Sequence, residues 1–487
     1  MTDHQNRVRA GGSGMRGVKI VATLGPATAE QGTLARLLAA GVDVVRLNAA
    51  HGDAAAHRRA IAGARTAAEA AGRALGVLVD LPGPKLRTGA VAGDLVQLAS
   101  GARFTLTGDA TRGGAPGDAT QCSTTVPELA GWVAPGDAVF LADGEIVLRV
   151  TRVVGDDVET EIVRGGLLRS HKGMHVPSAE LRVESFSAAD AAALALARRV
   201  RADFVGVSFV RTADDLHAVR ARLPKRGAQP ALVAKIETAA ALEHLDGIVD
   251  AADALMVARG DLGIQVPARR VPFLQKEIIR AANRAGKPVI TATQMLESMT
   301  RSPLPTRAEV SDIANAVIDG TDALMLSEET AVGAFPVEAV RTMAEVAESA
   351  ESWPRPAVLP VAGGEERDRV GWAVAHAAML AAEDLQVAAI LCPTRSGTTA
   401  RRVAAFRPSM PIVGLSPDPA VLGQLCLLRS VHPLLLEPCA DTEMQTRLAV
   451  RAARAARIVG RGELVAVVSG MPGRGRGHTD NVRIVRT

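Results

Sequence analysis

The chain has 487 residues, of which 48% are hydrophobic, 22% charged and only 2% aromatic. This length suggests about three domains, and the composition argues against a disordered protein. The 56 basic and 52 acidic residues give a net charge of +4, which is too small a surplus to indicate a nucleic-acid partner.

The chain shows no sign of a membrane span or a secretory signal. Its apolar runs are all shorter than the roughly 18–20 residues that a membrane span requires, and residues 1–14 contain no apolar stretch. We therefore expect a cytoplasmic protein with no membrane partner. Residues 1–17 are expected to form a flexible N-terminal tail.

From Val18 to about Ala350 the sequence alternates short apolar runs with longer amphipathic segments. Such runs are typical of strands that are buried on both faces of a parallel sheet. Eight of them in succession favour a closed (β/α)8 TIM barrel over an open sheet. The eight predicted strands are Val18–Leu24, Val42–Asn48, Leu75–Leu81, Asp203–Phe209, Ala231–Glu237, Ala254–Gly260, Pro288–Gln294 and Ala323–Glu329.

Residues 89–186 interrupt this pattern after the third predicted strand. Gly93–Thr107 and Val133–Val163 alternate apolar and polar residues, with turn signals such as Asp143-Gly144 between them. This pattern predicts a small inserted β-domain. An insertion at this point lies over the C-terminal mouth of the barrel, where it could act as a lid.

A second α/β unit follows the barrel. Its predicted strands are Val387–Cys392, Ile412–Leu415 and Glu463–Ser469. The predicted domains are therefore a barrel over residues 18–88 and 187–351, a lid over 89–186, a linker over 352–364 and a C-terminal domain over 365–487.

The ends of the predicted strands are almost all polar or charged, although they come from distant segments. In a barrel enzyme the catalytic groups lie at these C-terminal ends. Glu237 and Asp261 follow adjacent strands, and two carboxylates at the mouth suit Mg²⁺, which takes oxygen ligands and keeps several waters. The alternative is that they pair with Lys235 and Arg259. The strand-end residues are Arg46, Asn48, Asp80, Ser208, Lys235, Glu237, Asp261, Thr293, Ser327 and Glu329.

Lys235 precedes Glu237 by two residues, so both side chains point to the same face of their strand. A lysine beside a metal ion suits the stabilisation of a transferring phosphoryl group or of an enolate. Arg46 supplies a second cation for a phosphate or carboxylate. A metal ion, a lysine and an arginine are the groups that phosphoryl transfer requires.

Long motifs in this order closely resemble pyruvate kinase, over essentially the whole chain beyond residue 17. They are Val18–Pro26, Arg46–Asn48, Asp80 with Gly83–Gly89, Lys235–Glu237, Ala258–Gly263, Ala292–Met299, Pro305–Glu309, Met325–Ser327 and Gly477–Asn481.

The resemblance implies transfer of the phosphoryl group of phosphoenolpyruvate to ADP, giving pyruvate and ATP in glycolysis. It implies Mg²⁺ as cofactor, with Mn²⁺ as an alternative, held by Glu237 and Asp261. It also implies a homotetramer. The catalytic residues would be Lys235, Thr293 and Arg46. The substrate would be bound by Arg46, Ser208, Lys235, Gly260, Asp261 and Thr293. The nucleotide would be bound by Asn48, His51, Arg87 and, from the lid, Lys172.

Many members of the family need K⁺ beside the substrate phosphate, held by a serine, a threonine, an asparagine and an aspartate. This chain keeps Asn48 and Asp80 but has Ala50 and Leu81 at the other two positions. Lys85 stands where K⁺-requiring relatives carry glutamate, and its ammonium could replace the ion. The alternative is that Lys85 merely pairs with Asp80. We expect that K⁺ is not required.

One segment of the C-terminal domain resembles the effector-phosphate site of the family. Small hydroxyl residues and a glycine between a strand and a helix can form a cradle of backbone N–H groups for an anion, although an ordinary helix cap needs only one of them. We expect a phosphorylated metabolite effector at Thr394, Arg395, Ser396, Gly397, Thr398 and Thr399.

Two other functions are compatible with parts of the sequence. A Mg²⁺-dependent aldolase would also handle pyruvate enolate, but the lid with Lys172, and Arg87 below it, indicate a nucleotide. A non-catalytic, metabolite-binding relative would account for Ala50, Ala142 and Glu328, where the family usually has serine, aspartate and glycine. None of these departures touches the predicted metal ligands or Lys235.

Overall fold

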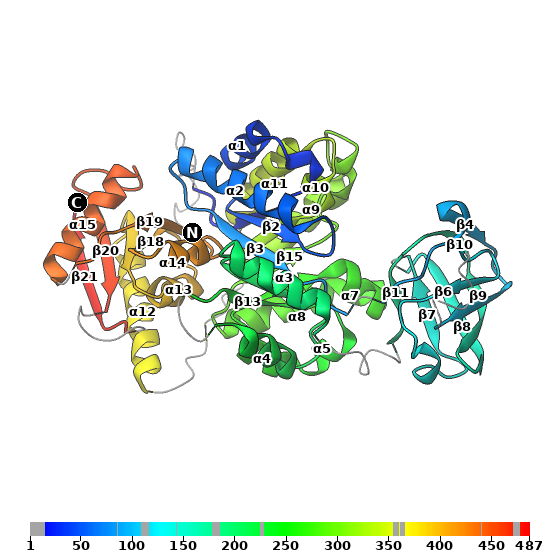
Figure 1. Cartoon of the computed structure of the whole chain (residues 1–487). Helices are drawn as coiled ribbons and strands as arrows, with labels where there is room; N and C mark the ends of the chain where they lie inside the picture. The colour runs from blue at the N-terminus through cyan, green and yellow to red at the C-terminus, as the bar shows by residue number, and fades with distance from the viewer. Residues whose placement is uncertain are drawn as a thin grey trace, which may run out of the picture.

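The computed structural model describes residues 15–84, 86–108, 116–142, 144–177, 186–224, 228–353, 360, 366–439, 441–470 and 478–487. These residues form a central barrel with an inserted β-domain on one side and a C-terminal α/β domain on the other (Figure 1). None of the helices in these ranges is long and apolar enough to cross a membrane. The predicted N-terminal tail lies almost entirely outside them.

Eight parallel strands close the barrel in the order β1-β16-β15-β14-β13-β12-β3-β2, which confirms the predicted (β/α)8 fold. The apolar runs form strands because both faces of each strand are buried. The strands end up to three residues earlier than predicted; β14, for example, gives way to helix α7 at Arg259, so Gly260 is helical. The strands are β1 (Lys19–Thr23), β2 (Val44–Asn48), β3 (Gly76–Asp80), β12 (Phe204–Val207), β13 (Ala231–Ile236), β14 (Ala254–Ala258), β15 (Val289–Ala292) and β16 (Ala323–Leu326).

Helices surround the barrel, and several of them begin with a side-chain cap. Asp53 accepts hydrogen bonds from the N–H groups of Ala55 and Ala56, and Thr306 forms a capping box with Glu309. The helices are α1 (Gln31–Ala40), α2 (Ala54–Ala70), α3 (Ala188–Arg199), α4 (Ala213–Arg222), α5 (Ala239–Glu243), α6 (Leu245–Ala251), α7 (Arg259–Gln265), α8 (Val271–Arg284), α9 (Arg307–Asp319), α10 (Glu328–Ala331) and α11 (Pro336–Glu351).

The barrel interior is closed at its N-terminal end. Val21, Met256 and Ile290 pack inside the barrel in one cluster with Cys426 and Leu427, which come from the C-terminal domain. The C-terminal domain therefore covers the N-terminal end of the barrel. The predicted active site and the inserted domain lie at the opposite end, where the strands finish.

The inserted domain is a mostly antiparallel β-structure, in which only the described pair β5–β6 is parallel, and it has its own core of residues such as Phe104, Leu141 and Leu148. A two-stranded sheet pairs β10 with β4, and a six-stranded sheet has the order β11-β7-β8-β9-β5-β6. The predicted alternation is seen in β8, where Ile146, Leu148 and Val150 are buried. The strands are β4 (Leu95–Leu98), β5 (Arg103–Thr107), β6 (Gln121–Ser123), β7 (Ala138–Leu141), β8 (Ile146–Val154), β9 (Asp157–Arg164), β10 (Gly166–Arg169) and β11 (Met174–His175).

The C-terminal domain is a five-stranded sheet in the order β19-β18-β17-β20-β21. The sequence predicts β17, β18 and β20 but not the two edge strands. β19 contains Pro433 and β21 contains Arg483 and Arg486, residues that edge strands tolerate and that hide the apolar pattern. Its elements are α12 (Glu366–Asp384), β17 (Ala389–Pro393), α13 (Thr398–Ala405), β18 (Ile412–Ser416), α14 (Pro419–Leu425), β19 (Val431–Leu435), α15 (Thr442–Ala455), β20 (Leu464–Ser469) and β21 (Asn481–Arg486).

Candidate active site

Lys235 lies at the centre of the barrel mouth. Its Nζ donates to Ser208 Oγ at 2.7 Å and lies 3.3 Å from Glu237 Oε2 and 3.8 Å from Asp80 Oδ2. Burial by itself lowers the pKa of Lys235, but the Glu237 and Asp80 carboxylates outweigh it and raise that pKa above its usual value. Lys235 is therefore a buried ammonium that stays charged at neutral pH.

Glu237 is fully buried beside this ammonium. Its Oε1 accepts a hydrogen bond from the Phe209 N–H at 2.6 Å, while its Oε2 has no hydrogen-bond partner among the described residues. Burial, helped by the nearby Asp261 charge, raises the pKa of Glu237 to about 7 although Lys235 opposes the shift. A buried acid with an oxygen that lacks a hydrogen bond suits a bound cation.

Asp261 lies in the first turn of α7 and lines the pocket below the lid. The sequence left open whether Glu237 and Asp261 pair with Lys235 and Arg259. Glu237 does form an ion pair with Lys235, at 3.3 Å. In the structure Arg259 pairs with Asp312 at 2.7 Å and also donates to the carbonyl of Thr293 at 2.6 Å. Together with Glu237, Asp261 fits Mg²⁺, which typically takes one or two carboxylates and completes its shell with waters and substrate phosphates.

Arg46 and Asp80 form a buried ion pair at the ends of β2 and β3. The Nε and Nη2 of Arg46 each lie 2.8 Å from Asp80 Oδ2. Asp80 Oδ1 is buried and has no hydrogen-bond partner in the described part of the chain. It occupies the space in which a Cβ on Gly206 would stand, so this strand position requires glycine.

Thr293 follows β15 in a left-handed conformation, with φ at 64°, and Gln294 is also left-handed at 55°. Such conformations are costly for residues other than glycine and are typical of functional sites. Thr293 Oγ1 accepts from the Gly260 N–H at 2.8 Å and donates to the Ala292 carbonyl at 2.7 Å. This hydrogen bond brings two of the predicted substrate-binding residues together.

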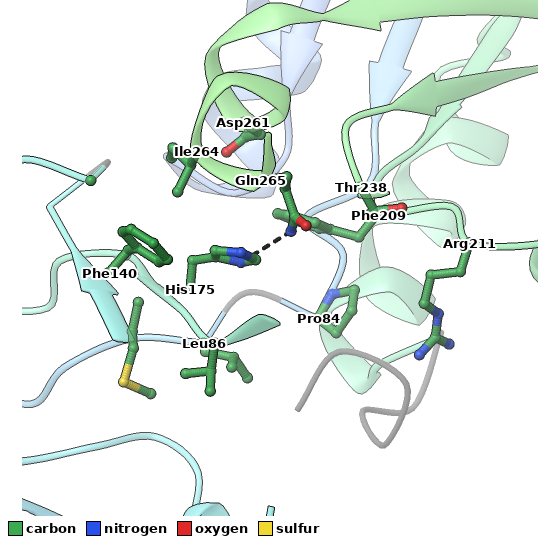
Figure 2. Close-up of a pocket in the computed structure, with 14 residues that line it drawn as sticks. Pro84, Leu86, Phe140, His175, Phe209, Arg211, Thr238, Asp261, Ile264 and Gln265 are labelled. Carbon is green, nitrogen blue, oxygen red and sulfur yellow. Dashed lines mark hydrogen bonds between the residues drawn. The ribbon is translucent and has the colours of Figure 1, made fainter. Parts of the chain in front are cut away.

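A pocket lies between the lid and the barrel (Figure 2). Asp261, Ile264 and Gln265 of α7 face His175 and Phe140 of the lid across it. The Gln265 side-chain nitrogen lies 3.1 Å from His175 Nδ1. Burial lowers the pKa of His175 to about 4, although the Asp261 charge opposes the shift, so the ring is neutral.

The predicted nucleotide-binding residues fall in two places. Arg87 and Lys172 lie on the two segments that connect the lid to the barrel, where Arg87 pairs with Gly173 in an antiparallel bridge. Arg87 Nη1 also donates to the carbonyl of His171 at 2.9 Å. Asn48 ends β2, and His51 is exposed in the turn that follows.

The predicted K⁺ substitute, Lys85, lies outside the described residues. Asn48 Oδ1 accepts from the Ala50 N–H at 3.2 Å. Asp80 Oδ2 is already engaged by Arg46, as described above. Ala50 and Leu81 contribute no side-chain oxygen to this part of the mouth.

The predicted effector segment links β17 to α13. Gly397 is left-handed, with φ at 79°, and precedes the first residue of α13. The hydroxyl groups of Ser396 and Thr398 form a hydrogen bond of 2.9 Å. The Thr399 hydroxyl is buried and forms a hydrogen bond of 2.9 Å with that of Thr479. Thr394 is held to Leu415 through its backbone N–H, and Arg395 is exposed.

Among the described residues, four that belong to the site are not predicted from the sequence. They are Phe209, whose N–H donates to Glu237; Asp312, the partner of Arg259; and the pair His175 and Gln265. Each acts through a partner that is distant in the chain, 90 residues away in the case of His175 and Gln265. Their spacing in the sequence therefore carries no signal of the contact.

A buried lysine, an arginine and two carboxylates at the mouth of a (β/α)8 barrel, below an inserted β-domain, are the groups that a phosphotransferase uses. Two family models match the chain: the barrel domain of pyruvate kinase over residues 15–340 and the alpha/beta domain of pyruvate kinase over residues 372–485. The chain belongs to the pyruvate kinase family.

Curated relatives extend this similarity over nearly the whole chain. The pyruvate kinase of Thermotoga maritima is 38% identical, over 97% of this chain and 100% of its own. That of Clostridium acetobutylicum is 36% identical, over 96% of this chain and 99% of its own. That of Geobacillus stearothermophilus is 39% identical, over 96% of this chain and 80% of its own.

Proposed function

We propose that the barrel mouth transfers the phosphoryl group of phosphoenolpyruvate to ADP, and that Lys235 is the central catalytic group. The observation that carries this proposal is the position of Nζ, a buried ammonium within 4 Å of both Glu237 and Asp80. A fixed charge in a buried site stabilises developing negative charge more strongly than the same charge in water. Lys235 would neutralise negative charge on the phosphoryl group during its transfer and on the enolate that forms when it departs.

Arg46 holds the transferred phosphate in this proposal. Its guanidinium is fixed by Asp80, so its remaining N–H groups are oriented before substrate arrives. Ser208 orients Lys235 through the 2.7 Å hydrogen bond. Ser208 itself is anchored because its hydroxyl donates to the Leu81 carbonyl at 2.7 Å.

Gly260 and Thr293 would bind the carboxylate end of phosphoenolpyruvate. A Cβ on Gly260 would meet Thr293 only at ordinary contact distances of 3.6 Å or more, so the packing of the protein does not by itself require glycine there. The missing side chain leaves room for a ligand at the first turn of α7. Thr293 would also lie next to the proton path to the enolate carbon.

Glu237 and Asp261 would hold Mg²⁺, with Mn²⁺ as an alternative. The ion would supply a further positive charge to the phosphate and orient it for in-line transfer. The nucleotide would lie between the turn after β2, with Asn48 and His51, and the base of the lid, with Arg87 and Lys172.

The test is a coupled assay for pyruvate from phosphoenolpyruvate with ADP and Mg²⁺. We expect turnover that requires all three. Binding of phosphoenolpyruvate without turnover would indicate the non-catalytic metabolite-binding relative, and aldol cleavage without ADP would indicate an aldolase.

We expect the enzyme to be nearly fully active in buffer that contains Mg²⁺ but neither Na⁺ nor K⁺. Two oxygen ligands are absent at Ala50 and Leu81, and a hard cation binds poorly without oxygen ligands. Lys85 would supply the missing positive charge, since a compact ammonium fits an ion-sized space better than a guanidinium.

The measurement is kcat in K⁺ and in a bulky organic cation at matched ionic strength. Lys85→Glu should lower kcat and give at most partial K⁺ dependence. Strong stimulation of the wild-type enzyme by K⁺, beyond the effect of the organic cation, would contradict the proposal.

We expect a phosphorylated metabolite to activate the enzyme through residues 394–399. The hydroxyl groups of Ser396, Thr398 and Thr399 are engaged with other hydroxyls, so the anion would be held chiefly by backbone N–H groups of the first turn of α13, with Arg395 beside it.

The homotetramer stays a prediction from the family.

The measurement is a titration of phosphorylated metabolites at low phosphoenolpyruvate. Ser396→Asp should abolish the response because it places a negative charge in the cradle, while leaving the basal rate unchanged. If no phosphorylated metabolite alters the rate of the intact protein, this site is not an activator site.

A further inference from the structure

Gln265 connects three segments that are far apart in the sequence, and Figure 2 shows its hydrogen bond with His175 of the lid. It is the last residue of α7, whose first turn carries Asp261. Its Oε1 accepts from the Ala239 N–H at 3.3 Å, and Ala239 follows Glu237 by two residues. Its Nε2 lies 3.1 Å from His175 Nδ1 in the lid. One amide thus contacts the lid and the backbone two residues after Glu237, and it belongs to the helix that carries Asp261.

The directions of these two hydrogen bonds are fixed by chemistry. The Ala239 N–H can only donate, so it requires the oxygen of the Gln265 amide and turns the NH₂ group toward the lid. The NH₂ group needs an acceptor, so His175 Nδ1 carries no proton and the neutral ring holds its proton on Nε2. The lid therefore presents one defined acceptor to one defined donor.

The parts on both sides of this bond are held in place. The ring of His175 stacks on Phe140, with centroids 5.8 Å apart and an interplanar angle of 27°. On the barrel side, Arg259 fixes the start of α7 through Asp312 and the Thr293 carbonyl. The lid at His175 is thus joined to the end of a helix whose beginning is anchored.

We propose that Gln265 is a positioning residue that couples the orientation of the lid to the two metal-binding segments. Through His175 it sets the position of the segment that carries Lys172, three residues earlier, and through Ala239 and α7 it steadies the backbone next to Glu237 and Asp261. The coupling rests on the proposed function, since its consequence is a nucleotide site and a metal site that form together.

The test compares Gln265→Leu, His175→Phe and the double variant with the wild-type enzyme. His175→Phe keeps an aromatic ring against Phe140 and removes only the acceptor. Loss of one such bond should raise the KM for ADP and the Mg²⁺ concentration for half-maximal rate about fivefold each. The double variant should be no worse than Gln265→Leu alone, because both changes remove the same bond.

Two matched controls should behave as wild type. Gln97→Leu removes a lid glutamine whose amide donates to the carbonyl of its neighbour Leu98 at 3.2 Å, and His217→Phe replaces an exposed histidine of α4. Wild-type ADP and Mg²⁺ dependence in both test variants would overturn the proposal, and so would effects that multiply in the double variant. If Gln265→Leu lowers the melting temperature, His175→Phe decides the question.

A wild-type enzyme without turnover would refute the proposed function but leave the coupling testable. Hydrogen exchange of the β11 amides and of the first turn of α7 would then be measured. The coupling predicts faster exchange at both places in both variants. Unchanged exchange in α7 would overturn the coupling.

Discussion

Replacing Lys235 with arginine is expected to lower kcat by about a hundredfold or more, although the positive charge is kept. The ammonium fits between Ser208 Oγ at 2.7 Å and Glu237 Oε2 at 3.3 Å, and its side chain is only 11% exposed. A planar guanidinium is broader and cannot place a point charge between phosphate and enolate. The KM for phosphoenolpyruvate should change much less than kcat.

Lys276→Arg is the matched control. Lys276 lies on α8, where its half-exposed ammonium pairs with Asp319, and it has no role in the proposed site. It should keep wild-type kcat and KM. The assigned role is wrong if Lys235→Arg keeps more than about a tenth of the wild-type kcat, a loss of less than 1.4 kcal/mol of transition-state stabilisation.

The sequence predicts the barrel well because each strand is a short apolar run buried on both faces. It also predicts which side chains share the mouth, since parallel strands end at the same edge. It does not predict their partners. Asp261 and Arg259 are two residues apart, yet Arg259 pairs with Asp312, 53 residues away, because side chains two apart in a helix point in different directions.

The lid illustrates the same limit at a larger scale. Its strands follow from the alternation of apolar and polar residues, and its place above the mouth follows from the point of insertion. Its contact with α7 depends on how two units with separate hydrophobic cores meet, and the periodicity of the sequence does not encode that contact. The Gln265–His175 bond therefore becomes visible only in three dimensions.

Replacing Glu237 with glutamine is expected to lower kcat at saturating phosphoenolpyruvate by at least about a hundredfold, because the site loses one of its two anionic metal ligands. The amide oxygen can still accept from the Phe209 N–H, so the backbone there keeps its hydrogen bond. Lys235 keeps Asp80 as a neighbour at 3.8 Å. The variant should therefore fold, and Mn²⁺ at high concentration should restore little of the rate.

The same substitution should change how stability depends on pH. Burial raises the pKa of Glu237 from its usual value of 4.5 to about 7, so the folded protein binds more protons than the unfolded chain between these values. Stability from this group therefore falls as pH rises through that window, and the full cost is present above pH 7. Glutamine does not titrate. The melting temperature of metal-free Glu237→Gln minus that of the metal-free wild type should therefore increase from pH 5 to pH 8.

The burial of Asp203 also raises its pKa to about 7, but Asp203 is shared by both proteins and cancels in their difference. Mg²⁺ should stabilise the wild type at pH 8 and have little effect on the variant, because the ion offsets the cost of the ionised carboxylate. A melting-temperature difference that is independent of pH, or equal stabilisation of both proteins by Mg²⁺, would contradict a metal-binding role for Glu237. A variant that is more stable than the wild type but inactive would mean that the buried charge is kept for the ion and not for the fold.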